Sequence, residues 1–198
     1  MTPPRQDYWL TRKEVAQRIR VARRNKRWRH VVRMLLIGCY TGTRPGATLK
    51  LRWVPSIDGK GGWFDLETET LHRRGAEDQI SKKVASRCRI HKRLLPWLKR
   101  WKVQDEAQGI SYAVHYLGKP LKKFRRSWAA VAKAAGHGHK DGPHIMRHTA
   151  ATWQMQAGVM LAEAAGYLGM SPQTMWSVYG HAHPDYQDRA ARASGRRR

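Results

Sequence analysis

The chain has 198 residues, 41% of them hydrophobic, which is enough to bury the core of one domain. Lys and Arg number 39 against 14 Asp and Glu, and the net charge of +25 predicts a polyanionic partner, in the first place nucleic acid. No apolar run reaches the length of a membrane span, no signal peptide is recognisable, and Cys39 and Cys88 lack metal or disulfide spacing, so we exclude membrane and secreted classes and expect a reducing, cytoplasmic location.

The first part of the chain predicts two helices and a turn. Thr11 and Glu14 form a capping box ahead of an apolar-periodic stretch, so the first helix runs from about residue 12 to residue 25. A second periodic stretch predicts a helix from residue 28 to about residue 40, and Gly42 is suited to end it in a left-handed conformation. Pro45 then biases Arg44 toward an extended backbone and opens a short further helix.

The rest of the chain combines a small sheet with more helices. Residues 63–72 and 84–90 predict two antiparallel strands, with two lysines at the end of the turn between them. Helical periodicity then predicts five segments, at about residues 92–105, 121–135, 144–157, 161–168 and 172–179. The predicted fold class is α+β, mainly α-helical with a small antiparallel β-sheet. We expect a linker or N-terminal tail over 1–10, one domain over 11–185 and a basic C-terminal tail over 186–198.

The stretch 143-PHIMRHTAATWQMQAG-158 places cationic or titratable groups at the head of an apolar-striped helix. Met146 falls on the side that faces the core, whereas His144, Arg147 and His148 fall on the other side. The proline suits the first helical position, and the free backbone N–H groups of the first turn predict an anion site beside His144. The alternative is a solvated helix face with a capping histidine.

Two further residues gain chemical interest from their local surroundings. Arg44 lies between a helix-ending glycine and a proline, so its guanidinium has little freedom to lose and suits bidentate binding of a phosphate. Tyr179 is the last residue before Gly180 at the end of a short helix, which makes its hydroxyl a candidate nucleophile. Each also has a plain structural interpretation, namely a solvated arginine and a core tyrosine with a hydrogen-bonded hydroxyl.

A basic block surrounds Phe124 and consists of Lys122, Lys123, Arg125 and Arg126. Because the whole chain is strongly basic, we interpret this block as a helix surface that follows a DNA backbone rather than as plain solvation. Lys82 is a further candidate for contact with DNA.

Five short motifs occur in the order and at the separations of one known family. They are TGTR at 41–44, a basic hairpin with Lys82 and Lys83, HIMRH at 144–148, LGM at 168–170 and VYGH at 178–181. From about Leu10 to Asp185 the chain therefore resembles the catalytic domain of tyrosine recombinases of the phage integrase type. The resemblance implies the fold of that domain over 11–185. It also implies a site-specific DNA recombinase that cleaves and rejoins duplex DNA through a 3′-phosphotyrosine intermediate.

The resemblance implies roles for five side chains. Arg44 and Arg147 would grip the non-bridging oxygens of the scissile phosphate, and His144 would assist proton transfer there. Lys83, favoured over its neighbour, would protonate the leaving 5′ oxygen, and Tyr179 would attack the phosphorus. Physical chemistry agrees, because fixed guanidiniums stabilise charge that builds up on a phosphate, and a phenol with a pKa of about 10 needs a base or a positive field.

Two positions depart from the family pattern. Met170 stands where a His or Trp is common, and it cannot donate a hydrogen bond to the phosphate. Either that donor is dispensable, or, as we hypothesise, His181 or His183 takes over the contact. Ala47 stands where an acidic residue often follows the first arginine, which suggests that Arg44 is either held less tightly or braced differently.

No cofactor or metal is expected. The covalent link would conserve the energy of the phosphodiester bond, so the reaction needs no ATP, and the sequence has no carboxylate cluster that would hold a metal ion. Two pairs have spacing that a metal ion can use but have no further ligand nearby, namely His137/His139 and His181/His183.

The resemblance implies double-stranded DNA as the partner and a homotetramer on two DNA segments. Residues 182–198 could dock on a neighbouring subunit, and accessory DNA-bending proteins are further candidate partners, in the nucleoid of a bacterial or phage-infected cell. Family members generally carry a separate DNA-clamping domain, so we expect weak, poorly selective DNA binding by this chain alone. Two alternatives stay open, a type IB topoisomerase-like nicking-closing enzyme and a non-catalytic DNA-binding remnant of a recombinase.

Overall fold

The computed structural model describes residues 8–78, 87–137, 141–188 and 191–192. The helices are α1 (Arg12–Arg24), α2 (Arg29–Thr41), α3 (Pro45–Thr48), α4 (Leu95–Glu106), α5 (Arg125–Ala134), α6 (Ile145–Gln156), α7 (Leu161–Leu168) and α8 (Pro172–Tyr179), with 3₁₀ turns η1 (Lys26–Trp28) and η2 (Gly180–Ala182). The strands are β1 (Trp63–Asp65), β2 (Thr70–His72), β3 (Cys88–Arg89), β4 (His115–Tyr116) and β5 (Lys119–Pro120). The first three form an antiparallel sheet in that order, and β4 pairs with β5. The mainly helical α+β class is therefore confirmed.

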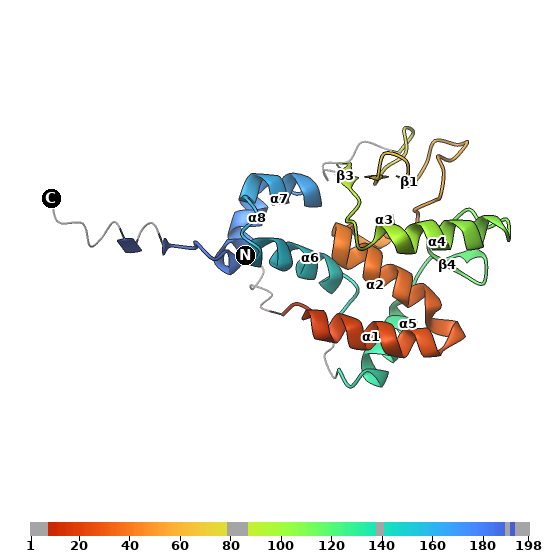
Figure 1. Cartoon of the computed structure of the whole chain (residues 1–198), viewed down its shortest axis with the longest axis horizontal. Helices are drawn as coiled ribbons and strands as arrows, with labels where there is room; N and C mark the ends of the chain where they lie inside the picture. The colour runs from red at the N-terminus through yellow and green to blue at the C-terminus, as the bar shows by residue number, and fades with distance from the viewer. Residues whose placement is uncertain (1–7, 79–86, 138–140, 189–190, 193–198) are drawn as a thin grey trace.

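Helix α6 lies at the centre of the molecule, between α7 and α8 on one side and the group of α1, α2, α4 and α5 on the other (Figure 1). One apolar cluster joins that group and the sheet to the head of α6 through Ile145 and Met146. A second cluster joins α6 to α7 and α8 and contains Ala151 and Tyr179. As a result α6 has no open face along its first turns, and Arg147, on the side predicted to face away from the core, is buried as well.

The local signals in the first part of the chain are confirmed. The Thr11 hydroxyl accepts the Glu14 N–H at 3.2 Å, and the Glu14 carboxylate accepts the Thr11 N–H at 2.7 Å, so the capping box is complete. Gly42 ends α2 with φ of 63°. Arg44 has an extended backbone, with φ of −57° and ψ of 138°, and Pro45 opens α3.

The single strand predicted over 63–72 is wrong, because these residues form the β1–β2 hairpin. The Asp65 carboxylate accepts the N–H groups of Glu67 and Thr68, which turns the chain, and Glu69 completes the turn with φ of 53°. Of the strand predicted over 84–90, Cys88–Arg89 is present as β3, which pairs with β2 rather than with β1, and residues 84–86 lie outside the described residues. Sequence analysis did not predict the β4–β5 hairpin.

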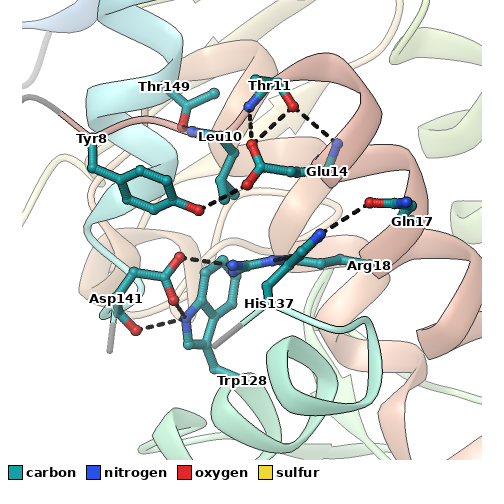
Figure 2. Close-up of polar contacts among 10 residues, drawn as sticks. All are labelled: Tyr8, Leu10, Thr11, Glu14, Gln17, Arg18, Trp128, His137, Asp141 and Thr149. Atoms are coloured by element: carbon teal, nitrogen blue, oxygen red, sulfur yellow. Dashed lines mark hydrogen bonds and ion pairs between the residues drawn. The ribbon is translucent and has the colours of Figure 1, made fainter. Parts of the chain in front are cut away.

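The described end of the predicted linker packs against the domain. Leu10 is fully buried, and its N–H donates to the Thr149 hydroxyl of α6 at 2.9 Å (Figure 2). The Tyr8 hydroxyl donates to the Glu14 carboxylate at 3.0 Å. These residues therefore tie the beginning of the described chain to both α1 and α6.

A buried polar network joins α1, α5 and the segment that leads into α6 (Figure 2). Arg18 forms an ion pair with Asp141 at 2.9 Å, and its Nε donates to Nδ1 of His137 at 3.0 Å. The Trp128 indole donates to the Asp141 carbonyl at 3.1 Å. Because Asp141 comes three residues before His144, this network fixes the approach of the chain to α6. Nε2 of His137 contacts the Gln17 side chain at 2.9 Å, so both ring nitrogens have protein partners.

None of the helices in the described part of the chain has the length and apolar character of a membrane-spanning segment. Within the same residues, no group of three His, Cys, Asp or Glu side chains is arranged to hold a metal ion. Cys39 and Cys88 are buried free thiols.

A Gly42→Ala variant is expected to lower the free energy of unfolding by about 2–4 kcal/mol, because the left-handed backbone costs about 1 kcal/mol and overpacking typically costs a further 1–3 kcal/mol. A Cβ at this position would lie 2.2 Å from Cδ2 of Leu168. Urea titration measures the change, with Gly46→Ala as the control, since a Cβ there meets open space. Equal unfolding midpoints for the two variants would contradict this account of Gly42.

Candidate active site

Arg147 links the ends of two helices. Its side chain is 8% exposed, and Nη1 donates to the Gly42 carbonyl at 2.7 Å and to the Leu168 carbonyl at 2.6 Å. Nη2 donates to the Gly169 carbonyl at 3.1 Å. These carbonyls end α2 and α7, where the helix dipoles place partial negative charge that suits a cation. Within the described residues, Nε–H and one Nη2 hydrogen of the five guanidinium donors have no protein partner, so they are available to an anion.

Arg73, to which the sequence analysis gave no role, braces the same two helix ends. It follows β2 and is buried. Its Nη2 donates to the Thr41 carbonyl at 2.6 Å and to the Tyr167 carbonyl at 2.8 Å, and its Nε donates to the Thr43 hydroxyl at 3.1 Å. Arg73 and Arg147 therefore bind neighbouring carbonyls of the same two segments. The sequence shows only that Arg73 directly follows a predicted strand, and this position does not indicate its contacts with the two helix ends.

The segment that carries Arg44 is held by threonines. The Thr48 hydroxyl donates to the Arg44 carbonyl at 3.2 Å, and the hydroxyls of Thr41 and Thr43 lie 2.6 Å apart. Arg73 holds Thr43 from the other side. Arg44 itself is half-buried at the start of α3. The position of Arg44 thus depends on Arg73 and on hydroxyl contacts, and Ala47 contributes no charge to it.

Three guanidiniums interact electrostatically at this site. Burial, followed by the charges of Arg44 and Arg73, lowers the pKa of Arg147 to about 10. Burial and the charge of Arg73 also lower the pKa of Arg44, and burial lowers that of Arg73. Repulsion among like charges is a cost that a bound anion would relieve. The arrangement is therefore suited to a phosphate-sized anion.

Tyr179, the last residue of α8, lies beside this cationic cluster. Its side chain is 7% exposed, and its hydroxyl lies 2.8 Å from Nδ1 of His148. Burial raises the pKa of Tyr179 to about 12, although the charge of Arg147 acts in the opposite direction. The phenol is therefore protonated at neutral pH, and it can act as a nucleophile only if another group takes its proton.

His148 is the second residue to which the sequence analysis assigned no role. Burial, together with the neighbouring His144 and Arg147, lowers its pKa. It is therefore neutral at pH 7, and the neutral ring can accept the phenol hydrogen at Nδ1. The available signal was its spacing of four residues from His144, which puts both rings on one face of α6.

The anion site predicted at the free N–H groups of the α6 head is wrong. The chain makes a tight turn ahead of the helix, in which the Ile145 N–H donates to the Gly142 carbonyl at 3.0 Å and the Met146 N–H to the Pro143 carbonyl at 3.4 Å. The helix begins at Ile145, so Pro143 lies in this turn and not at the first helical position. His144 is exposed at the helix head. The cluster of positive charge in this part of the molecule is therefore made by guanidiniums and not by helix-head amides.

Comparison with known proteins identifies the family. The sequence profile of the phage integrase family matches residues 8–185. The chain belongs to the phage integrase family. Among curated protein sequences, none matches it.

Solved structures with the same fold are tyrosine recombinases. XerA recombinase is 20% identical with a TM-score of 0.68, and the match covers 100% of this chain and 68% of XerA. A fragment of the Tn1549 transposon integrase, solved with circular intermediate DNA, is 14% identical with a TM-score of 0.69, covering 95% of this chain and 67% of that one. XerH bound to palindromic difH DNA is 19% identical with a TM-score of 0.62, and this integrase-family chain covers only 53% of it. The predicted recombinase-like fold is confirmed.

The other predicted site residues lie away from the guanidiniums or outside the described residues. Lys82 and Lys83 are in the segment that the structure does not describe. In this integrase-family chain the exposed basic block lies at the start of α5, namely Lys122, Lys123, Arg125 and Arg126. Ser127 of α5 contacts His30 near the start of α2, whereas Thr41 at the other end of α2 contacts Arg73. His30 and Thr41 are 11 residues apart, so the two contacts are about 16 Å apart along α2.

The structure places Met170 and the two histidines that were predicted to replace its missing hydrogen bond. Met170 packs partly buried against the second apolar cluster. His181 is exposed in η2, and Nδ1 of His183 accepts the Asp185 N–H at 3.1 Å. Neither histidine contacts the guanidiniums through a hydrogen bond in the described part of the chain. Their replacement of the missing donor stays a prediction.

Proposed function

We propose that this chain cleaves and rejoins duplex DNA at specific sites through a 3′-phosphotyrosine intermediate. The observation that carries the proposal is the position of Tyr179, a buried hydroxyl held at 2.8 Å by His148 and close enough to Arg147 for the arginine charge to oppose the rise in pKa that burial causes. A nucleophile beside an anion site is the pair of elements that attack on a phosphodiester requires. Membership of the phage integrase family supports the same reaction.

In the proposed reaction, Arg44 and Arg147 bind the non-bridging oxygens of the scissile phosphate. Negative charge that develops on those oxygens is stabilised by guanidiniums whose positions are already fixed, so little reorganisation is needed. The Tyr179 oxygen bonds to phosphorus as the bond to the 5′ oxygen breaks. His144, exposed at the α6 head, assists proton transfer at the phosphate, and Lys83 supplies the proton to the 5′ oxygen.

Duplex DNA is the proposed partner, on which the chain acts as a homotetramer. The net charge of +25 and the exposed block at the start of α5 provide contacts to phosphates on the flank of the scissile position. The structures of the Tn1549 integrase and XerH were solved with DNA, which supports DNA as the partner of this chain. Since the chain spans only part of those relatives, we expect weak and poorly selective binding without further protein.

The proposal is tested by trapping the covalent intermediate. The chain is incubated with a pool of nicked duplexes of randomised sequence, and adducts are separated on denaturing gels and sequenced. We expect an adduct whose modified peptide, identified by mass spectrometry, carries the nucleotide on Tyr179. Because binding by this chain alone is poorly selective, we expect only moderate enrichment of one DNA sequence in the adducts over the starting pool. An adduct on another residue would contradict the mechanism.

The same assay separates the alternatives. A type IB topoisomerase-like enzyme would form the Tyr179 adduct without sequence enrichment and would relax plasmids that lack the enriched site. A DNA-binding remnant would retain salt-sensitive DNA binding but would give no adduct on any member of the pool.

A further inference from the structure

The contact between His148 and Tyr179 joins a basic nitrogen to the proposed nucleophile. His148 is on the second turn of α6 and Tyr179 ends α8, so two different helices bring the groups together. The hydroxyl lies 2.8 Å from Nδ1, which is within the normal range for an O–H···N hydrogen bond. Within the described residues this is the one hydrogen bond of the Tyr179 hydroxyl. The hydroxyl donates to Nδ1 when the neutral imidazole carries its proton on Nε2, and this is the tautomer in which His148 can accept the phenol proton.

Resting on the function proposed above, we propose that His148 is the general base that removes the proton of Tyr179 as the phenol oxygen attacks the scissile phosphate. The Oη–H bond of tyrosine breaks and an Nδ1–H bond forms on the imidazole, while the Oη–P bond forms and the P–O5′ bond breaks. The 5′ oxygen takes a proton from a general acid or from solvent water. In the rejoining step the 5′ hydroxyl gives its proton to the conjugate base of that acid or to water and attacks phosphorus. The P–O5′ bond forms as the Oη–P bond breaks, and the imidazolium returns its proton to the Tyr179 oxygen.

Geometry distinguishes His148 from His144. His144 is exposed at the α6 head, and no hydrogen bond links it to Tyr179 in the described residues. The ring of His148 is half-buried, with its centroid 5.7 Å from that of the tyrosine ring. The two histidines therefore have different proposed roles. His144 assists proton transfer at the phosphate, and His148 accepts the proton of the nucleophile.

The surroundings of His148 keep it in the form that a base needs. The charged or titratable groups that face it are His144 and Arg147 on its own helix and Tyr179 on α8. Burial and the first two groups lower the pKa of His148 below its usual value. A lowered pKa means that the neutral, basic form is present above that pKa and is lost as the pH falls through it. Cleavage should therefore persist at pH 6.5 and fall only at more acidic pH.

His148→Asn tests the inference, because the amide oxygen of asparagine can accept the phenol hydrogen but is not basic. On the DNA sequence recovered from the pool, we expect the rate of adduct formation at pH 7 to fall about 100-fold, since a general base typically contributes 10²–10⁴-fold. The rate of the variant should rise with pH, because ionisation of the phenol replaces the lost base. Urea midpoints and DNA binding at two salt concentrations serve as folding controls.

The outcomes separate this inference from the proposed function. A parent adduct together with an undiminished rate in His148→Asn would overturn the role of His148 and leave the proposed function in place. No adduct from the parent would overturn both. A readout without DNA is the ¹⁵N NMR titration of His148 in the parent and in Tyr179→Phe. An Nδ1 resonance that does not change between these two proteins would show that the hydrogen bond is absent and would also overturn the inference.

Discussion

An Arg147→Lys variant is expected to form the covalent DNA adduct about 1,000-fold more slowly than the parent, since loss of one positioned donor to a developing oxyanion costs about 10²–10³-fold and lysine loses the bidentate geometry as well. A lysine ammonium has three donors on one atom. It cannot hold the carbonyls of Gly42 and Leu168 and also present a planar pair of donors to a phosphate. Lysine keeps the positive charge of Arg147, so the decrease in the rate of adduct formation reports the loss of the guanidinium geometry.

The same variant is expected to unfold more easily. Arg147 ties the ends of α2 and α7 together through three carbonyls, and hydrogen bonds from charged groups contribute about 1.5–3 kcal/mol each when a partner is lost. We expect a loss of about 2–4 kcal/mol in the free energy of unfolding, because lysine can retain part of the contact. Urea titration gives this value, and single-turnover adduct formation gives the rate.

Arg100→Lys is the matched control for this prediction. Arg100 is exposed on α4, away from the two helix ends, so this substitution should change neither quantity. If Arg147→Lys reacts within tenfold of the parent, the phosphate is not bound by the guanidinium. If the rate falls while the urea midpoint is unchanged, the three carbonyl contacts contribute little to stability.

Features with short-range causes could be predicted from the sequence. The Thr11–Glu14 capping box, the left-handed Gly42 and the extended Arg44 before Pro45 each depend on neighbours within a few residues. Helix positions followed from the 3.6-residue period of apolar side chains. The wrong prediction at the head of α6 also has a short-range cause. The tight turn at Gly142 and Pro143 accepts N–H groups that a simple helix start leaves free.

The roles of Arg73 and His148 could not be predicted in this way, because their partners are distant in sequence. Arg73 meets the Tyr167 carbonyl 94 residues later, and His148 meets Tyr179 31 residues later. The family resemblance implied roles for residues that would contact the substrate, and it gave no role to Arg73 or His148. Burial of an arginine or a histidine becomes visible only when the fold is known, and burial is what lowers the pKa of both.

Asp141→Ala is expected to lower the free energy of unfolding by about 3–5 kcal/mol, because removal of one partner of a buried ion pair leaves the other charge buried and uncompensated. The side chains of Arg18 and Asp141 are 1% and 2% exposed and lie 2.9 Å apart. The control is Glu106→Ala, which breaks an exposed pair with Lys102 on α4 and should cost about 0.5 kcal/mol or less.

A double variant distinguishes loss of the pair from loss of packing. Arg18→Met combined with Asp141→Ala removes both charges, so it should recover part of the stability lost in Asp141→Ala alone. Because Asp141 lies just ahead of the turn into α6, the single variant should also slow adduct formation by displacing His144. In the absence of DNA, the displacement of His144 in Asp141→Ala should be detected as a shift of the His144 NMR resonance relative to the parent. A cost for Asp141→Ala no greater than that for Glu106→Ala would mean that the Arg18–Asp141 pair in Figure 2 does not contribute to the stability of the fold, and that other contacts position α6.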